Sequence, residues 1–138
     1  MTEPTSLWGS LPLEADMKPP IVFLKEQASI LSKQTGGLLV GDVATQSATP
    51  ALKAWLDIIS PSLNGYRFRV LQIEHGLAFY PVTVVDLAAG SVSEANEEAG
   101  YVAALQRILS SPRVHKVVAA LISQTKATTS DLPTDNQG

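Results

Sequence analysis

Glu74 and His75 are adjacent in the stretch QIEHGLAFYP, residues 72–81. A carboxylate beside an imidazole is the kind of residue pair that general base catalysis uses. Adjacent strand residues, however, point to opposite faces of a sheet, so these two side chains would not converge. The flanking runs are rich in aromatic and β-branched residues, which predicts a hairpin with His75-Gly76 as its two-residue turn, Glu74 facing Leu77, and an exposed His75. We therefore assign no catalytic residue.

Arg67 and Arg69 are two positions apart in a predicted strand, so their side chains share one face. Two guanidinium groups side by side can clamp a carboxylate or a phosphate. The alternative is that they pair across strands with Asp57 or Asp42. This pair is the best local candidate for contact with a polar ligand or a partner.

Trp55 shares strand parity with polar neighbours and is therefore either an interface anchor or a side chain buried under a helix. Tyr80 and His75 complete a hypothetical small-molecule site. The candidate ligand- or partner-binding residues are Arg67, Arg69, Trp55, Tyr80 and His75. His115 is expected in the solvated first turn of a helix, and neither histidine belongs to an HxH or HExxH motif. The sequence predicts no metal site and no cofactor.

The composition excludes several classes of function. The chain has 138 residues and a net charge of −3, with ten Lys and Arg and no run of them. This charge predicts neither nucleic-acid binding nor a polybasic membrane anchor. The absence of cysteine excludes disulfides and thiol nucleophiles. No apolar stretch approaches the roughly 20 residues of a membrane span, and no signal peptide is recognised, so we expect a soluble cytoplasmic protein.

The chain is expected to contain one domain, residues 19–125, between a flexible N-terminal arm and a disordered tail. The arm, 1–18, is broken by prolines and a glycine, although its apolar residues could dock on a surface; these are Leu7, Trp8, Leu11 and Leu13. A helix is predicted from Pro19-Pro20 to Gly36, and a strand over 37–47. After the hairpin, 86–92 is expected to be a loop, and Ser93 and Ser111 are expected to cap two helices. The tail is 126–138.

Residues 53–60 are ambiguous. Leu52, Trp55, Leu56 and Ile59 have helical spacing, but the same segment also alternates as a strand would. Around it, the order LKEQASILSKQTGGLLVGDV, ISPSLNGYRFRVLQIEHGLAFYPVTV and VAALQRILSSPRVHKVVAALISQ resembles a family of small uncharacterised bacterial proteins. The resemblance covers residues 20–125 and implies a strand over 53–60. It carries over no activity and no functional residue.

These elements predict an α+β fold in which an N-terminal helix, an antiparallel sheet of about four strands and two C-terminal helices follow one another. If side chains alternate between the two faces along the whole hairpin, both faces of the sheet are partly apolar. Either helices then cover both faces, or a partner subunit buries one of them. We expect a non-enzymatic protein–protein interaction module, such as an adaptor, chaperone or immunity-type protein, that forms a homodimer. The alternative is a small-molecule or anion-binding protein, or a small enzyme, with its site near Arg67 and Arg69. A concave pocket there would favour the alternative, and a flat or self-paired surface would not.

Overall fold

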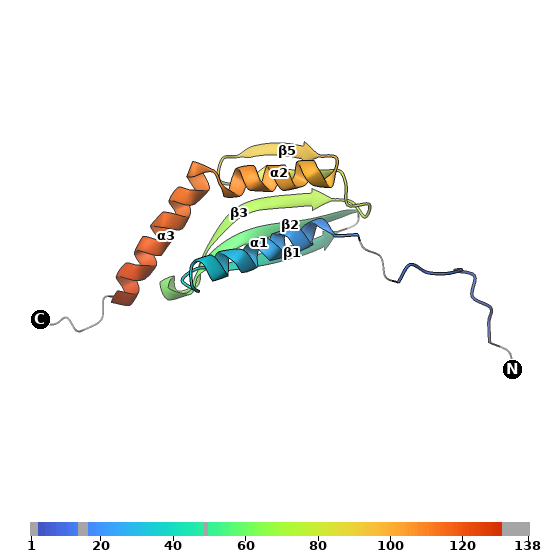
Figure 1. Ribbon diagram of the computed structural model, residues 1–138, viewed down its shortest axis with the longest axis horizontal. Coiled ribbons are helices and arrows are strands. Elements are labelled where there is room, and N and C mark those ends of the chain that lie inside the picture. Colours follow the sequence, from blue (N-terminus) through green and yellow to red (C-terminus); the bar gives the residue numbers. More distant parts are fainter. Residues whose placement is uncertain (1–2, 14–16, 49, 131–138) are drawn as a thin grey trace, which may run out of the picture.

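The structure is a computed structural model that describes residues 3–13, 17–48 and 50–130. Figure 1 shows how its elements are arranged. Three α-helices, five strands and one short 3₁₀ helix occur in the order α1 (Pro20–Gln34), β1 (Val40–Ala48), β2 (Ala51–Ser60), η1 (Pro61–Leu63), β3 (Tyr66–His75), β4 (Val82–Asp86), β5 (Ser91–Ala95), α2 (Glu98–Leu109) and α3 (Pro112–Ser130).

The five strands form one antiparallel sheet in the order β1-β2-β3-β4-β5, so each strand pairs with its neighbour in the chain. Helix α1 packs on β1 and β2, and α2 packs on β4 and β5, on the same side of the sheet (Figure 1). Helix α3 continues from the end of α2 and lies against η1. We call this the helix side of the sheet and the opposite surface the open side. The predicted α+β class and helix order are confirmed, with five strands in place of about four.

Local signals fix the ends of α1. Pro20 occupies the first turn, where a missing N–H costs no hydrogen bond, and Gly36 adopts a positive φ of 60° just after the helix. Leu24 and Ala28 are the buried residues that face the sheet. Gly41 of β1 allows a close approach, because a Cβ there would lie 2.4 Å from the backbone of Ala28. The sequence of β1 thus lets α1 rest directly on the sheet.

Residues 53–60 belong to strand β2, so the predicted strand is confirmed. Ala54, Leu56 and Ile58 all point to the helix side and are buried in the core. Pairing with strands on both sides therefore decides against the helical spacing of the same apolar residues.

A β-bulge interrupts the pairing of β2 and β3. Leu56 faces Leu71 and Asp57 faces Arg69, so Val70 has no opposite residue in β2. One extra residue exchanges the faces of all side chains that follow it. Apolar residues on both sides of the bulge therefore reach the helix side, and polar residues on both sides reach the open side; the polar set is Arg67, Arg69, Gln72 and Glu74. The predicted division of the apolar β3 residues between two faces is wrong, because it assumed unbroken alternation. The open side is still partly apolar, through Trp55, Ile59, Val85 and Val92.

The connection between β3 and β4 is longer than predicted. His75 pairs with Val82, so residues 76–81 form the turn and Glu74 faces Thr83 instead of Leu77. His75 is the last residue of β3 and is only 8% exposed, since the ring of Phe79 packs edge-on against it. The prediction of an exposed histidine at a two-residue turn is therefore wrong. Phe79 itself has a positive φ of 75°, a backbone conformation that non-glycine residues rarely adopt.

The segment after β4 also differs from the prediction. Residues 91–95 form strand β5, where we predicted a loop and a helix cap at Ser93. Helix α2 begins only at Glu98. Pairing with β4 is what makes this segment a strand, because Ser93 faces Val84 and Ala95 faces Val82.

Helix α3 begins as predicted, with the Ser111 hydroxyl accepting a hydrogen bond from the Val114 N–H at 3.2 Å. It continues through residues 126–130, which the prediction of a disordered tail had included; residues 131–138 lie outside the described residues. A buried hydrogen bond joins α3 to the sheet, with 2.6 Å between Ser60 Oγ and Thr125 Oγ1. Residues 3–13 of the arm contain neither helix nor strand, and 1–2 and 14–16 lie outside the described residues.

The first prediction concerns the close approach of α1 and β1. Gly41→Ala should lower the free energy of unfolding by about 2 kcal/mol or more, because the added methyl group meets helix backbone that must shift. Gly100→Ala is the matched control, since its Cβ would meet only ordinary contacts, and it should stabilise α2 by up to about 1 kcal/mol. Urea denaturation measures both, and equal effects of the two substitutions would contradict the described packing.

The second prediction concerns Tyr101, which is fully buried and whose hydroxyl donates to the Pro20 carbonyl oxygen at 2.7 Å. Burial raises the pKa of this phenol well above its ordinary value, so it stays protonated as a donor. Tyr101→Phe should cost about 1 kcal/mol in unfolding free energy, because the carbonyl of α1 loses its partner in α2. Tyr66→Phe, at an exposed position, should change nothing measurable. An unchanged midpoint for Tyr101→Phe would argue against this link between the helices.

Candidate functional site

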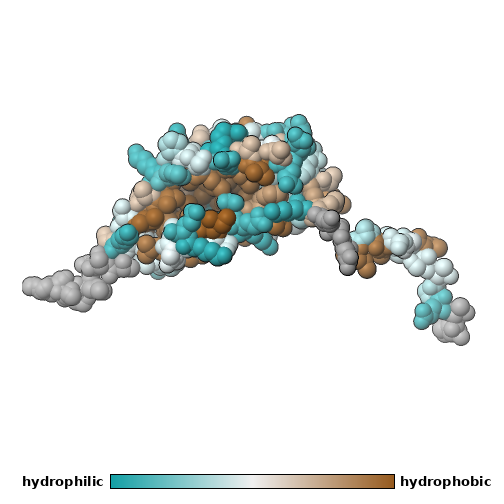
Figure 2. Space-filling view, in the orientation of Figure 1, coloured by the Kyte–Doolittle hydropathy of each residue, from teal (hydrophilic) through white to brown (hydrophobic). Residues whose placement is uncertain are grey.

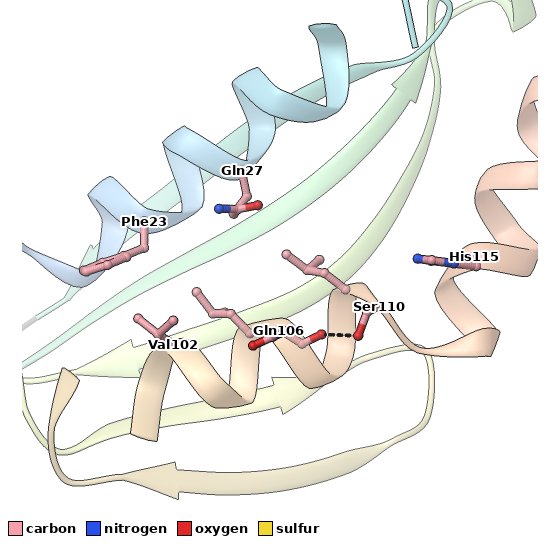
Figure 3. Close-up of a pocket in the computed structure, with 8 residues that line it drawn as sticks. Phe23, Gln27, Val102, Gln106, Ser110 and His115 are labelled. Atoms are coloured by element: carbon pink, nitrogen blue, oxygen red, sulfur yellow. Dashed lines mark hydrogen bonds between the residues drawn. The ribbon is translucent and has the colours of Figure 1, made fainter. Parts of the chain in front are cut away.

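A groove runs between α1 on one side and α2 and the start of α3 on the other (Figure 3). It consists of two pockets of about 370 and 310 Å³. Both pockets include Gln27, Leu109 and His115, so they are continuous. We call the combined cavity the helix-side groove.

The three elements each contribute one wall of the groove. Phe23 and Gln27 of α1 point toward Val102 and Gln106 of α2, and His115 of α3 closes one end (Figure 3). The floor is the sheet itself, through Leu56, Ile58 and Val70. Figure 2 shows apolar side chains gathered in this hollow between α1 and α2, with polar residues around them.

The groove offers mainly apolar contact. Val102 and Ile30 line it and remain 39% and 41% exposed. The polar groups are the amides of Gln27, Gln34 and Gln106, the hydroxyls of Thr35 and Ser110, and the His115 imidazole. The Ser110 hydroxyl donates to the Gln106 carbonyl oxygen at 2.6 Å. Apolar walls with a few hydrogen-bonding groups are typical of sites that bind apolar side chains together with a backbone.

The open side carries an ion-pair network centred on Asp57, whose side chain is fully buried under two arginines. Arg69 donates from Nε to Asp57 Oδ1 at 3.0 Å and from Nη2 to Oδ2 at 3.2 Å. Arg67 Nη1 donates to Asp57 Oδ2 and also to Asp42 Oδ2 at 3.1 Å. The hydrogen bond that Arg67 donates to Asp57, followed by the one to Asp42, raises the pKa of the Arg67 guanidinium. The predicted alternative of cross-strand pairing is what the structure shows.

Trp55 belongs to the same surface. Its indole Nε1 donates to Gln72 Oε1 at 2.9 Å, and the Arg69 guanidinium carbon lies 4.7 Å from the ring centroid. This stacking is a cation–π contact on the open side, so Trp55 is half-buried by its neighbours in the sheet instead of by a helix.

The other two predicted residues lie on the helix side. His75 lines a third pocket of about 250 Å³ with Pro19 and Phe79, and its Nδ1 lies 2.6 Å from the Gly76 carbonyl oxygen. Tyr80 packs edge-on against Tyr101, and burial, with a smaller contribution from Glu98, raises the pKa of its phenol. Among the described residues, its hydroxyl has no hydrogen-bond partner. The structure thus brings Arg67, Arg69 and Trp55 together, but it separates them from His75 and Tyr80.

The groove residues were not predicted, although the sequence holds a signal for them. Each helix has a second row of residues beside its buried stripe, at three- and four-residue spacing. In α1 this row is Phe23, Gln27 and Ile30, and in α2 it includes Val102, Gln106 and Leu109. A helix whose apolar surface is wider than one stripe has a flank that its own sheet does not cover.

Two searches of the structure concern other classes of site. Within residues 3–13, 17–48 and 50–130, no group of three or more His, Cys, Asp or Glu side chains could hold a metal ion. No helix in the described part of the chain is long and apolar enough to cross a membrane.

Comparison of the chain with protein-family models, with curated proteins and with solved structures gives no match. The resemblance to a family of small bacterial proteins stays a prediction.

The third prediction concerns the ion-pair network. Asp57→Ala should lower the free energy of unfolding by about 2 kcal/mol, because a buried carboxylate that accepts three N–H bonds is lost. Asp42→Ala removes a half-exposed partner of Arg67 and should cost at most about 1 kcal/mol. Chemical denaturation of both variants tests the difference, and an equal loss would mean that Asp57 is not the centre of the network.

Proposed function

We propose that the protein is a protein-binding module whose helix-side groove holds an apolar segment of another protein. One observation carries this proposal: a continuous groove of about 370 and 310 Å³ keeps large apolar side chains accessible between the helices. Exposed apolar surface gathered in one concavity is characteristic of interaction sites.

The chemistry of the walls supports a peptide as the occupant. Apolar side chains of a partner would fill the two pockets, where Val102 and Ile30 lose their remaining contact with water. The Gln27 and Gln106 amides, facing each other across the groove, can both donate to and accept from a peptide backbone. This combination of side-chain pockets and backbone hydrogen bonds is how grooves recognise peptide segments.

The alternative, an anion or small-molecule site at Arg67 and Arg69, has less support. Both guanidinium groups are already engaged by Asp57 and Asp42, and Arg69 also stacks on Trp55. An incoming anion would have to compete with these carboxylates. The pockets that form the groove contain neither arginine.

The fourth prediction tests the groove. The tagged chain should capture a stoichiometric protein partner from the native organism, and Val102→Glu and Ile30→Glu should each weaken this capture by about tenfold or more. Placing a carboxylate in an apolar pocket opposes burial of the partner's side chain, whereas both positions are exposed enough for the fold to persist. Affinity purification with quantitative mass spectrometry makes the measurement.

Val92→Glu is the matched control, since Val92 is a similar apolar residue, 66% exposed, on the open side. It should retain the partner in full. Loss of the partner in Val92→Glu or in Arg67→Ala/Arg69→Ala, with retention in both groove variants, would place the interface on the open side and refute the proposal.

A further inference from the structure

The N-terminal arm exposes an unusual set of side chains. Four large apolar residues between positions 4 and 13 are between 52% and 94% exposed; they are Leu7, Trp8, Leu11 and Leu13. Residues 4–13 contain no charged side chain, although the chain has 23 in total, ten Lys and Arg and thirteen Asp and Glu. An uncharged segment that holds a tryptophan and three leucines in water has the composition of a binding segment.

The backbone of the arm is suited to binding as a non-helical segment. Pro4, Gly9 and Pro12 oppose a helix, and the structure shows none over residues 3–13. Gly9 has a φ of 70° and the Leu13 N–H donates to the Leu11 carbonyl oxygen at 2.9 Å, so the arm bends and its apolar side chains do not alternate as in a regular strand. The prolines also restrict the free arm, so less conformational freedom is lost when it binds.

The helix-side groove matches the arm in charge and in chemistry. Among the described residues, those that line the groove include no Asp, Glu, Lys or Arg. An uncharged segment can enter without leaving a buried charge unpaired. Each of the two pockets is large enough for a leucine or tryptophan side chain, and the Gln27 and Gln106 amides remain available to the arm's backbone.

The start of α1 directs the arm away from its own groove. Pro19 is extended, with φ −62° and ψ 149°, as a residue that precedes a proline prefers. Figure 1 shows residues 3–13 extending beyond the start of α1, on the opposite side of the body from α3. To fill the groove of its own chain, the arm would have to fold back over the start of α1. The arm of a second copy can approach without folding back in this way.

From these features we infer that two copies of the chain exchange arms, each placing Leu7–Leu13 in the helix-side groove of the other. Reciprocal exchange is a two-fold arrangement that closes on itself, so it yields a dimer and not a chain of copies. The inference rests on the proposed function in using the same groove. It implies that a partner segment binds by displacing the arm, so partner binding and arm exchange compete.

The two tryptophans make the test direct, because Trp8 is in the arm and Trp55 is on the open side. The Trp55→Phe chain, complete in all other respects, leaves Trp8 as the single fluorescent reporter. Its emission and its sedimentation are followed over about a thousandfold range of concentration, wide enough to register a tenfold change in Kd. We expect a dimer with blue-shifted Trp8 emission at high concentration, and both signals should revert together on dilution.

Groove and control variants in the same Trp55→Phe background complete the fifth prediction. Val102→Glu and Ile30→Glu should raise the dimer Kd by about tenfold or more, and Val92→Glu should leave it unchanged. Circular dichroism checks that each variant is folded. A blue-shifted Trp8 in a chain that remains monomeric would mean that the arm fills its own groove and would overturn the exchange. A dimer with water-exposed Trp8, or a monomer with water-exposed Trp8, would overturn arm docking altogether.

The same variants separate this inference from the proposed function. If Trp8 stays exposed while both groove substitutions still abolish partner capture, arm exchange fails and the protein-binding groove stands. If arm docking depends on the groove while partner capture does not, the proposed function fails and arm exchange stands.

Discussion

Val70, the residue of β3 without a partner in β2, determines which side chains reach each surface of the sheet. Before it, odd-numbered residues of β3 face the open side, and after it, even-numbered residues do. Without this extra residue, either Arg67 and Arg69 would lie on the helix side, or Leu71 and Ile73 would lie on the open side. Val70 itself is buried and forms part of the groove floor, so the bulge also shapes the surface between the helices.

Different interactions stabilise the two sides of the sheet. On the helix side, three helices cover an apolar sheet, and the gap between α1 and α2 remains as a groove. On the open side, Asp57 is shielded from water by Arg67 and Arg69, and Trp55 is held by Arg69 and Gln72. Self-pairing of the charges lets this face be covered by its own side chains. On the helix side, the groove keeps apolar side chains accessible, and the proposed function uses this surface.

Local signals were enough to predict elements whose ends depend on a single residue. Pro20 and Gly36 bound α1, and Ser111 caps α3, because each satisfies or avoids a backbone hydrogen bond at that position. Strand β5 was missed because Ser91–Ala95 has weak strand propensity and becomes a strand only by pairing with β4. The β3–β4 register was missed for a similar reason, since the conformation of Phe79 in the connecting turn does not follow from neighbouring residues. The bulge at Val70, in the pairing of β2 with β3, was missed as well.

One part of the candidate site could be predicted from the sequence and another part could not. Pairing of the arginines with Asp57 or Asp42 was foreseeable as an alternative, because strand alternation alone places them on one surface. The groove could not be predicted in this way, because Phe23 belongs to the helix that precedes the strands in the chain and Val102 to a helix that follows them. Their proximity depends on how far apart α1 and α2 lie over the five strands, a distance that no local pattern encodes.

The order of the strands has a consequence for how the chain folds. Every strand pairs with its neighbour in sequence, so the sheet closes only short loops, which cost little chain entropy. Two buried hydrogen bonds are different: Tyr101 reaches Pro20 across 81 positions, and Thr125 reaches Ser60 across 65. Their loop-closure entropy is recovered only when the sheet already holds the helices near each other. We therefore expect both hydrogen bonds to form late in folding, when most of the fold is in place. The groove between α1 and α2 would then reach its final shape only when the bond between Tyr101 and Pro20 forms.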